Sequence, residues 1–203
     1  MQLLQSLMRR LAPFLAVFVT VLPLSAPAQM AAPQEGNQYI RLKSPQPVET
    51  GKKIEVIEFF SYGCPHCGEL EPHLQNWFKT MPADVQFRRI PVMFQERWAP
   101  LAKIYYTLEA LGEEARLTPE VFSALHGKGL SLWQEKTFFD WAAGQGLDRK
   151  KVEDMYNSFG IGGKVNRARL AAQAYQVQSV PLLVVDGKYV TNKVSSHGAM
   201  PVV

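Results

Sequence analysis

The two cysteines of this 203-residue chain lie three positions apart, in the stretch Cys64-Pro65-His66-Cys67. An apolar run precedes this stretch and a helical pattern follows it. Cys64 therefore takes the position of a helix N-cap and Pro65 the first helical position. The N–H groups of His66 and Cys67 would then face the Cys64 sulfur at the positive end of the helix dipole, and a protonated His66 would add a favourable charge. These contributions predict a lowered pKa for Cys64, and a thiolate is the nucleophilic form of cysteine.

The motif is also compatible with three less reactive roles. A structural disulfide between Cys64 and Cys67 would close a very small loop and remove little entropy from the unfolded chain. A zinc site could use both cysteines with His66 and His73, although a second half-site at the usual spacing is missing. His66 could also be an ordinary surface residue. That interpretation is the one we give to the remaining histidines, which are His73, His126 and His197.

Residues 1–28 have the layout of a cleavable secretory signal peptide. Arg9 and Arg10 precede an apolar run over residues 11–24, and the small residues 25–28 offer a cleavage site. The run is shorter than the ~20 residues of a membrane-spanning helix. The sequence therefore predicts export, and so an oxidising compartment.

The charge balance gives no support for nucleic-acid binding. The chain has 22 Lys and Arg against 18 Asp and Glu, a net charge of +4 that falls to +2 when the two arginines of the leader are removed. This is too weakly basic to indicate a nucleic-acid partner. We expect the short basic runs, Arg88-Arg89 and residues 149–151, to lie on solvated faces.

Hydrophobic patterns predict an α/β fold. Residues 39–42 are typical of an edge strand, and residues 54–60 of a strand buried on both faces. A helix from Pro65 and a strand over 85–92 complete a βαβ unit. Helical spacing then recurs in segments that end at or near glycine, and Asp186-Gly187 between two apolar runs indicates a β-hairpin. The expected helical segments are 98–112, 118–129, 135–146, 148–160 and 165–177.

These segments suggest a division of the chain into four parts. Residues 1–28 form the signal peptide, and residues 29–94 the first part of an α/β domain. Residues 95–164 form a helical insertion, and residues 165–203 the second part of the α/β domain. We expect no helix after the hairpin, because the chain stops at SSHGAMPVV.

Together, FFSYGCPHCGELEP, the helical insertion and SVPLLVVDGKYVT resemble the DsbA family of bacterial periplasmic thiol:disulfide oxidoreductases. The resemblance extends from about residue 39, and CPHC in this context is specific to the family. It implies a thioredoxin-like fold interrupted by a helical domain. The family normally ends in a helix packed on the sheet, and in this respect the sequence departs from it.

The resemblance also implies roles for individual residues. Cys64 would form the mixed disulfide with substrate, and Cys67 would be its buried resolving partner. Val180-Pro181 would form the loop whose proline is cis, and its backbone would pair with an extended substrate segment. Glu58 would be a buried acid beneath the cysteines that handles protons. Its alternatives are pairing with a nearby basic group or contact with solvent at the strand end.

The expected function is that of a monomeric periplasmic dithiol oxidase. Its Cys64–Cys67 disulfide would pass to reduced, newly exported proteins through a mixed disulfide, without a cofactor or a metal. The resemblance implies regeneration by a membrane quinone-linked partner of the DsbB type. A reductase or isomerase on the same scaffold remains a rival, as does a non-enzymatic holdase or zinc-binding module.

Overall fold

The computed structural model describes residues 32–192. The chain separates into two units, residues 1–32 and residues 33–203, and the second unit contains all of the helices and strands given below. The predicted signal peptide and the predicted lack of a final helix lie outside the described residues.

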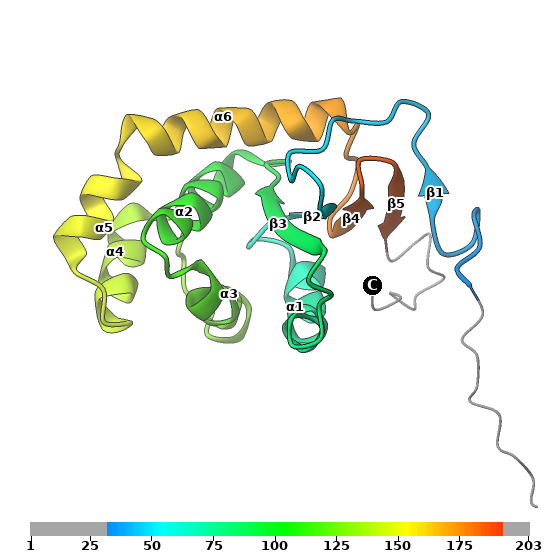
Figure 1. The fold of residues 1–203 in the computed structure, drawn as a ribbon. Coiled ribbons are helices and arrows are strands. Elements are labelled where there is room, and N and C mark those ends of the chain that lie inside the picture. Colours follow the sequence, from blue (N-terminus) through cyan, green and yellow to red (C-terminus); the bar gives the residue numbers. More distant parts are fainter. Residues whose placement is uncertain (1–31, 193–203) are drawn as a thin grey trace, which may run out of the picture. The chain divides into compact units, whose positions relative to one another are not determined.

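A five-stranded mixed sheet forms the centre of the fold, in the order β1-β5-β4-β2-β3 (Figure 1). The strands are β1 Ile40–Arg41, β2 Ile54–Phe60, β3 Val85–Pro91, β4 Leu182–Val185 and β5 Tyr189–Asn192. The β2 and β3 strands are parallel and the other pairs are antiparallel. All of the strands expected from the sequence are present, which confirms the βαβ unit and the hairpin.

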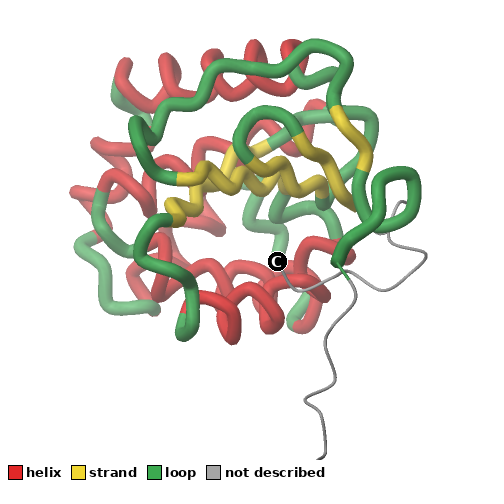
Figure 2. The backbone as a smooth tube through the Cα atoms, turned by 45° about the vertical axis from the view of Figure 1, so that its right-hand side comes forward, coloured by secondary structure: helices red, strands yellow, loops and turns green. Residues whose placement is uncertain are grey.

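Two helices cover opposite faces of this sheet, as Figure 2 shows. Helix α1, Pro65–Phe78, packs Leu70, Leu74 and Trp77 against Val56 of β2. Helix α6, Phe159–Ala174, lies on the other face, where the larger core cluster includes Ile57 and other buried apolar residues. Since successive residues of β2 point to opposite faces, both faces of this strand are buried, and its nearly continuous apolar sequence follows from that.

Four helices separate β3 from α6 and form the helical part that the sequence predicted. They are α2 Ala99–Ala110, α3 Glu114–Phe122, α4 Glu135–Gly144 and α5 Arg149–Tyr156. A 3₁₀ turn, η1 Glu96–Trp98, leads into α2, and a π-helical turn, η2 Ser123–Gly127, follows α3. Helix α3 also packs against α1, which connects the helical part to the segment that carries the cysteines.

The first residues of α3 and α6 lie well before the expected positions, and α5 ends at Tyr156 rather than at residue 160. Helix α6 begins at Phe159, whereas its spacing predicted a start at residue 165. Ser158 caps it by accepting a hydrogen bond from the N–H of Ile161 at 3.3 Å. Three glycines within the first turns weaken the helical signal there, and the cap together with tertiary packing overrides it. Helix α3 begins at Glu114, four residues before the expected start.

The β4–β5 turn confirms the hairpin signal. Asp186 and Gly187 have φ angles of 52° and 62°, the left-handed conformation that a tight two-residue hairpin requires. A Cβ on Gly187 would lie 2.2 Å from the carbonyl oxygen of Gln46, so glycine is also required by close packing. Across residues 32–192, no helix is long and apolar enough to cross a membrane.

Candidate active site

Both cysteines are free thiols at the N-terminal end of α1. Cys64 is the N-cap residue with an extended backbone, Pro65 is the first residue of the helix, and Cys67 lies one turn into it. Cys64 is 7% exposed and Cys67 is fully buried, so Cys64 is the more accessible thiol. The Cys64 thiol donates a hydrogen bond to the carbonyl oxygen of Val180 at 3.4 Å.

This arrangement lowers the pKa of Cys64 to about 6. The largest cause is a hydrogen bond from the Cys67 side chain, and burial of Cys64 opposes it. The backbone N–H groups of Cys67 and His66 and the charge of His66 contribute less. No side-chain capping hydrogen bond joins these N–H groups to the Cys64 sulfur, so they stabilise the thiolate through their dipoles. The predicted direction of the shift is confirmed, but its main cause, Cys67, was not foreseen.

Cys67 has the opposite tendency, because burial raises the pKa of its thiol well above the ordinary value. Its hydrogen bond to Cys64 and the nearby charge of Glu58 raise the pKa further. The two thiols are therefore electrostatically different. Near neutral pH Cys64 is the anion and Cys67 holds a proton.

The loop that faces the cysteines contains the Val180–Pro181 peptide bond, which is cis as the resemblance implied. The loop leads into β4, which pairs with β2 from Phe59↔Leu182 onward. The C-terminal end of β2 and the N-terminal end of β4 therefore lie side by side at the same end of the sheet. This pairing brings Val180 next to Cys64, although the two residues are 116 positions apart in sequence.

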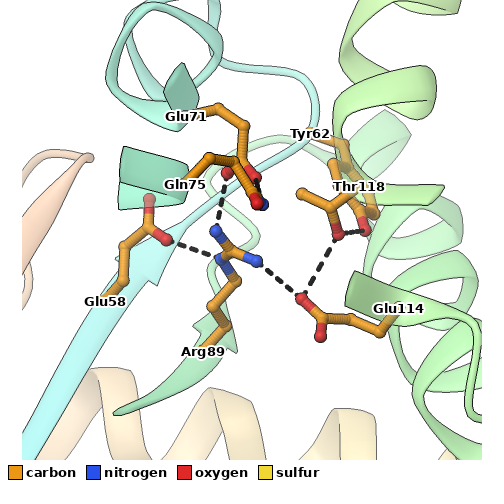
Figure 3. Close-up of polar contacts among 7 residues, drawn as sticks. All are labelled: Glu58, Tyr62, Glu71, Gln75, Arg89, Glu114 and Thr118. Atoms are coloured by element: carbon orange, nitrogen blue, oxygen red, sulfur yellow. Dashed lines mark hydrogen bonds and ion pairs between the residues drawn. The ribbon is translucent and has the colours of Figure 1, made fainter. Parts of the chain in front are cut away.

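Beneath the cysteines, Glu58 belongs to a buried charged cluster centred on Arg89 (Figure 3). Nε of Arg89 donates to Glu58 at 2.8 Å, and its two terminal nitrogens donate to Glu71 and Glu114, each at 2.6 Å. Burial raises the pKa of Glu58 to about 7, although Arg89 opposes this shift, and the charges of Glu71 and Glu114 add to it. Glu58 can therefore gain or lose a proton near neutral pH.

The position of Arg89 corrects one expectation from the sequence. Arg88-Arg89 was expected on a solvated face, but Arg89 is 5% exposed and pairs with three carboxylates. Glu58 and Arg89 are directly paired in the β2–β3 register. Since a buried charge needs a partner, the acid on β2 requires the base opposite it on β3. Of the alternatives for Glu58, pairing with a basic group is therefore confirmed.

Other side chains hold the turn between β2 and α1. His126 Nε2 makes a hydrogen bond of 2.8 Å with the carbonyl oxygen of Tyr62, so this histidine contacts the active-site turn. A Cβ on Gly63 would lie 2.4 Å from Nε1 of Trp98, so the turn needs glycine here. His66 is exposed, and its Nδ1 lies 3.0 Å from Glu69.

Residues 32–192 contain no group of three or more His, Cys, Asp or Glu side chains arranged to hold a metal ion. The sequence alone did not identify Arg89, Glu71, Glu114 or His126 as neighbours of the site. One signal could have identified Arg89: in the predicted βαβ unit, it lies on the strand next to that of Glu58, at the position paired with Glu58.

A thiol pair at the start of a helix, opposite a cis-proline loop at one edge of a mixed sheet, defines a thioredoxin-like dithiol protein. The chain belongs to the DSBA-like thioredoxin domain family, whose model matches residues 55–201.

Curated relatives and solved structures agree with this assignment. The chain is 42% identical to "Thiol:disulfide interchange protein DsbA" of Bordetella parapertussis over 171 residues, which are 84% of this chain and 80% of the relative. It is 43% identical to the protein of that name from Pseudomonas aeruginosa over 154 residues, 76% and 73% of the two chains.

The crystal structure of Pseudomonas aeruginosa DsbA superposes with a TM-score of 0.76 at 42% identity, covering 80% of this chain and 85% of that one. The oxidoreductase NmDsbA1 of Neisseria meningitidis superposes with a TM-score of 0.72 at 28% identity, covering 83% and 89%.

Proposed function

We propose that this protein is a periplasmic dithiol oxidase that donates a Cys64–Cys67 disulfide to reduced exported proteins. The observation that carries the proposal is the difference between the two thiols. The pKa of Cys64 is lowered to about 6, and that of Cys67 is raised. A protein that stabilises its reduced thiolate makes its own disulfide a stronger oxidant.

The reaction begins when a substrate thiolate attacks the Cys64 sulfur. The Cys64–Cys67 bond breaks, a bond between Cys64 and the substrate sulfur forms, and Cys67 leaves as a thiolate. The proton of Glu58 passes to this buried thiolate, for which charge is costly. A second substrate thiolate then attacks the substrate sulfur of the mixed disulfide and releases Cys64 as a thiolate. Two electrons move from the substrate to the protein, and the substrate leaves with a disulfide.

We assign substrate contacts to Val180 and Pro181, in addition to Cys64. The Val180 carbonyl oxygen lies within hydrogen-bonding distance of the Cys64 sulfur, so an extended segment bonded to Cys64 passes along this loop. Pro65 and His66 support the site, Pro65 by starting α1 without a backbone donor and His66 by its charge. A groove of about 440 Å³ lined by Pro65, Pro119 and Phe122 provides apolar surface beside the cysteines.

A trapping experiment tests the covalent step. In the Cys67→Ala variant, activated as a mixed disulfide at Cys64, a peptide with one cysteine should form an adduct with Cys64 that mass spectrometry detects. The Cys64→Ser variant is the matched control and should form none. An adduct in the control, or none in the variant, would contradict the assignment of the nucleophile.

Equilibration with glutathione separates an oxidase from a reductase or isomerase on the same scaffold. Reference potentials are about −120 mV for the DsbA type and about −270 mV for thioredoxin. We expect a value near the first. A value near the second would favour a reductase.

We further propose that the protein is a monomer, that residues 1–28 direct its export, and that a membrane quinone-linked protein of the DsbB type reoxidises it. Sedimentation tests the first point, and N-terminal sequencing of the exported protein, expected to begin at Gln29, tests the second. Reoxidation by quinone-containing membranes, but not by membranes that lack the DsbB-type protein, tests the third.

A further inference from the structure

Arg89 connects three different elements of the fold through its guanidinium group. It donates to Glu58 on β2, to Glu71 on α1 and to Glu114 on α3, as the dashed lines in Figure 3 show. The side chains of Glu58 and Glu71 are 1% and 4% exposed, whereas that of Glu114 is 23% exposed. The helical part thus contributes one carboxylate to a charged cluster that otherwise belongs to the sheet and α1.

Glu114 is held in place by its position in α3 and by two hydrogen bonds. It is the first residue of α3, where the N-terminal end of the helix dipole stabilises a negative charge. It accepts hydrogen bonds from Arg89 at 2.6 Å and from the Thr118 hydroxyl at 3.3 Å. Thr118 in turn lies 2.8 Å from the hydroxyl of Tyr62, two residues before Cys64. These contacts fix the carboxylate between the guanidinium group and the active-site turn.

The cluster contains more negative than positive charge when all of its acids are ionised. The charged or titratable groups that act on Glu58 are Arg89 of β3, Glu71 and Cys67 of α1, and Glu114 of α3, whereas β4 places the apolar Leu183 opposite Glu58. Among these described groups, Arg89 is the one that favours ionisation of Glu58, and it also pairs with Glu71 and Glu114. Because the positive charge of Arg89 is shared among three carboxylates, it stabilises the Glu58 carboxylate less, and Glu58 keeps its proton more readily.

We propose that Glu114 is a positioning residue for the thiol chemistry, which acts through Arg89 on the proton that Glu58 holds beneath Cys67. The inference rests on the proposed function, in which this proton passes to the Cys67 thiolate when the disulfide opens. In that step the Glu58 O–H bond breaks, the Cys67 S–H bond forms, and Glu58 is left as a carboxylate. Water later returns a proton to Glu58, so no other reactant is needed.

The test compares Glu114→Gln with Glu120→Gln. Both changes remove one negative charge from α3, but Glu120 lies outside the cluster. Glutamine at position 114 keeps an oxygen that can accept from Arg89. NMR titration of ¹³C-labelled glutamate carboxyls should show the Glu58 midpoint falling by about one pH unit in Glu114→Gln, because a nearby negative charge is lost. It should not move in Glu120→Gln.

The second measurement is the rate at which a reduced dithiol peptide opens the disulfide, followed against pH. The change in rate that follows the ionisation of Glu58 should occur at a lower pH in Glu114→Gln and at an unchanged pH in Glu120→Gln. A Glu58 titration that Glu114→Gln leaves unchanged would overturn the inference. A titration that moves without a matching change in the rate profile would also overturn it.

A purely structural role for Glu114 would alter stability without moving either profile. If Glu114→Gln does not fold, Glu114→Asp and Glu114→Asn form a second pair that shares a shorter side chain and differs in charge. The Glu58 midpoint should then be higher in the aspartate variant, and equal midpoints would overturn the inference. If the wild-type disulfide does not react with the peptide, the proposed function is refuted. If it reacts but the Glu114 variants leave the Glu58 titration unchanged, only the role of Glu114 is refuted.

Discussion

Acidification should remove a stabilising contribution that the Cys64 thiolate makes to the reduced protein. The pKa of Cys64 is about 6 in the fold and 9.0 for an unperturbed thiol. A group with a lower pKa in the folded state stabilises the fold at high pH. This contribution is complete above pH 9 and is lost as the pH falls through 6.

The size of the effect follows from the difference between the two pKa values. Three pH units correspond to about 4 kcal/mol of unfolding free energy. Because the unfolded thiol is still protonated at neutral pH, about 1 kcal/mol is present at pH 7 and about 3 kcal/mol at pH 8. Solvent screening reduces this little, since Cys64 is 7% exposed.

Urea unfolding of the reduced wild type and of Cys64→Ser at pH 5, 7 and 8 measures this contribution. Serine does not ionise in this range, so the difference between the two proteins isolates the thiolate from other titrating groups. The difference should grow by about 3 kcal/mol from pH 5 to pH 8. In parallel, the ultraviolet absorbance of the thiolate should titrate with a midpoint of about 6. A constant difference, or a midpoint near ~8.5 as in free cysteine, would refute the reasoning.

Three further predictions concern the surroundings of the thiol. Cys67→Ala should raise the thiolate midpoint more than His66→Ala does, because the Cys67 hydrogen bond is the largest contribution and the His66 charge the smallest; equal shifts in the absorbance titration would contradict this ranking. Glu58 has a pKa of about 7 against 4.5 when unperturbed, so it destabilises the folded protein as the pH rises from 4.5 to 7. In urea unfolding, the stability of the wild type relative to Glu58→Gln should therefore fall by about 3 kcal/mol between pH 4 and 8, and a difference that stays constant with pH would contradict a raised pKa. Gly63→Ala should cost about 1–3 kcal/mol because its Cβ would overlap Trp98, whereas Gly144→Ala, where no atom lies within 4 Å, should cost nothing; thermal unfolding of both variants measures the difference, and equal stabilities would exclude the overlap.

Local patterns in the sequence determined most of the α/β framework. The apolar run 54–60, the helix after Pro65 and the Asp186-Gly187 turn depend on interactions between residues close in sequence, and all three are present. The same holds for Cys64, since its position at a helix N-terminus follows from CPHC itself. The start of α6 was missed because glycines obscure the helical spacing there.

The neighbours of the thiols were decided by the tertiary structure. Val180 reaches Cys64 only because β4 pairs with β2, and Glu114 reaches Arg89 only because α3 packs against α1. The burial of Arg89 likewise depends on three acids from separate elements meeting at one point. A sequence pattern records which residues share a face of one element, and it contains no information on which faces meet. The sequence therefore determined which residues carry the thiol chemistry, and the fold decided the charges and hydrogen bonds that set their proton affinities.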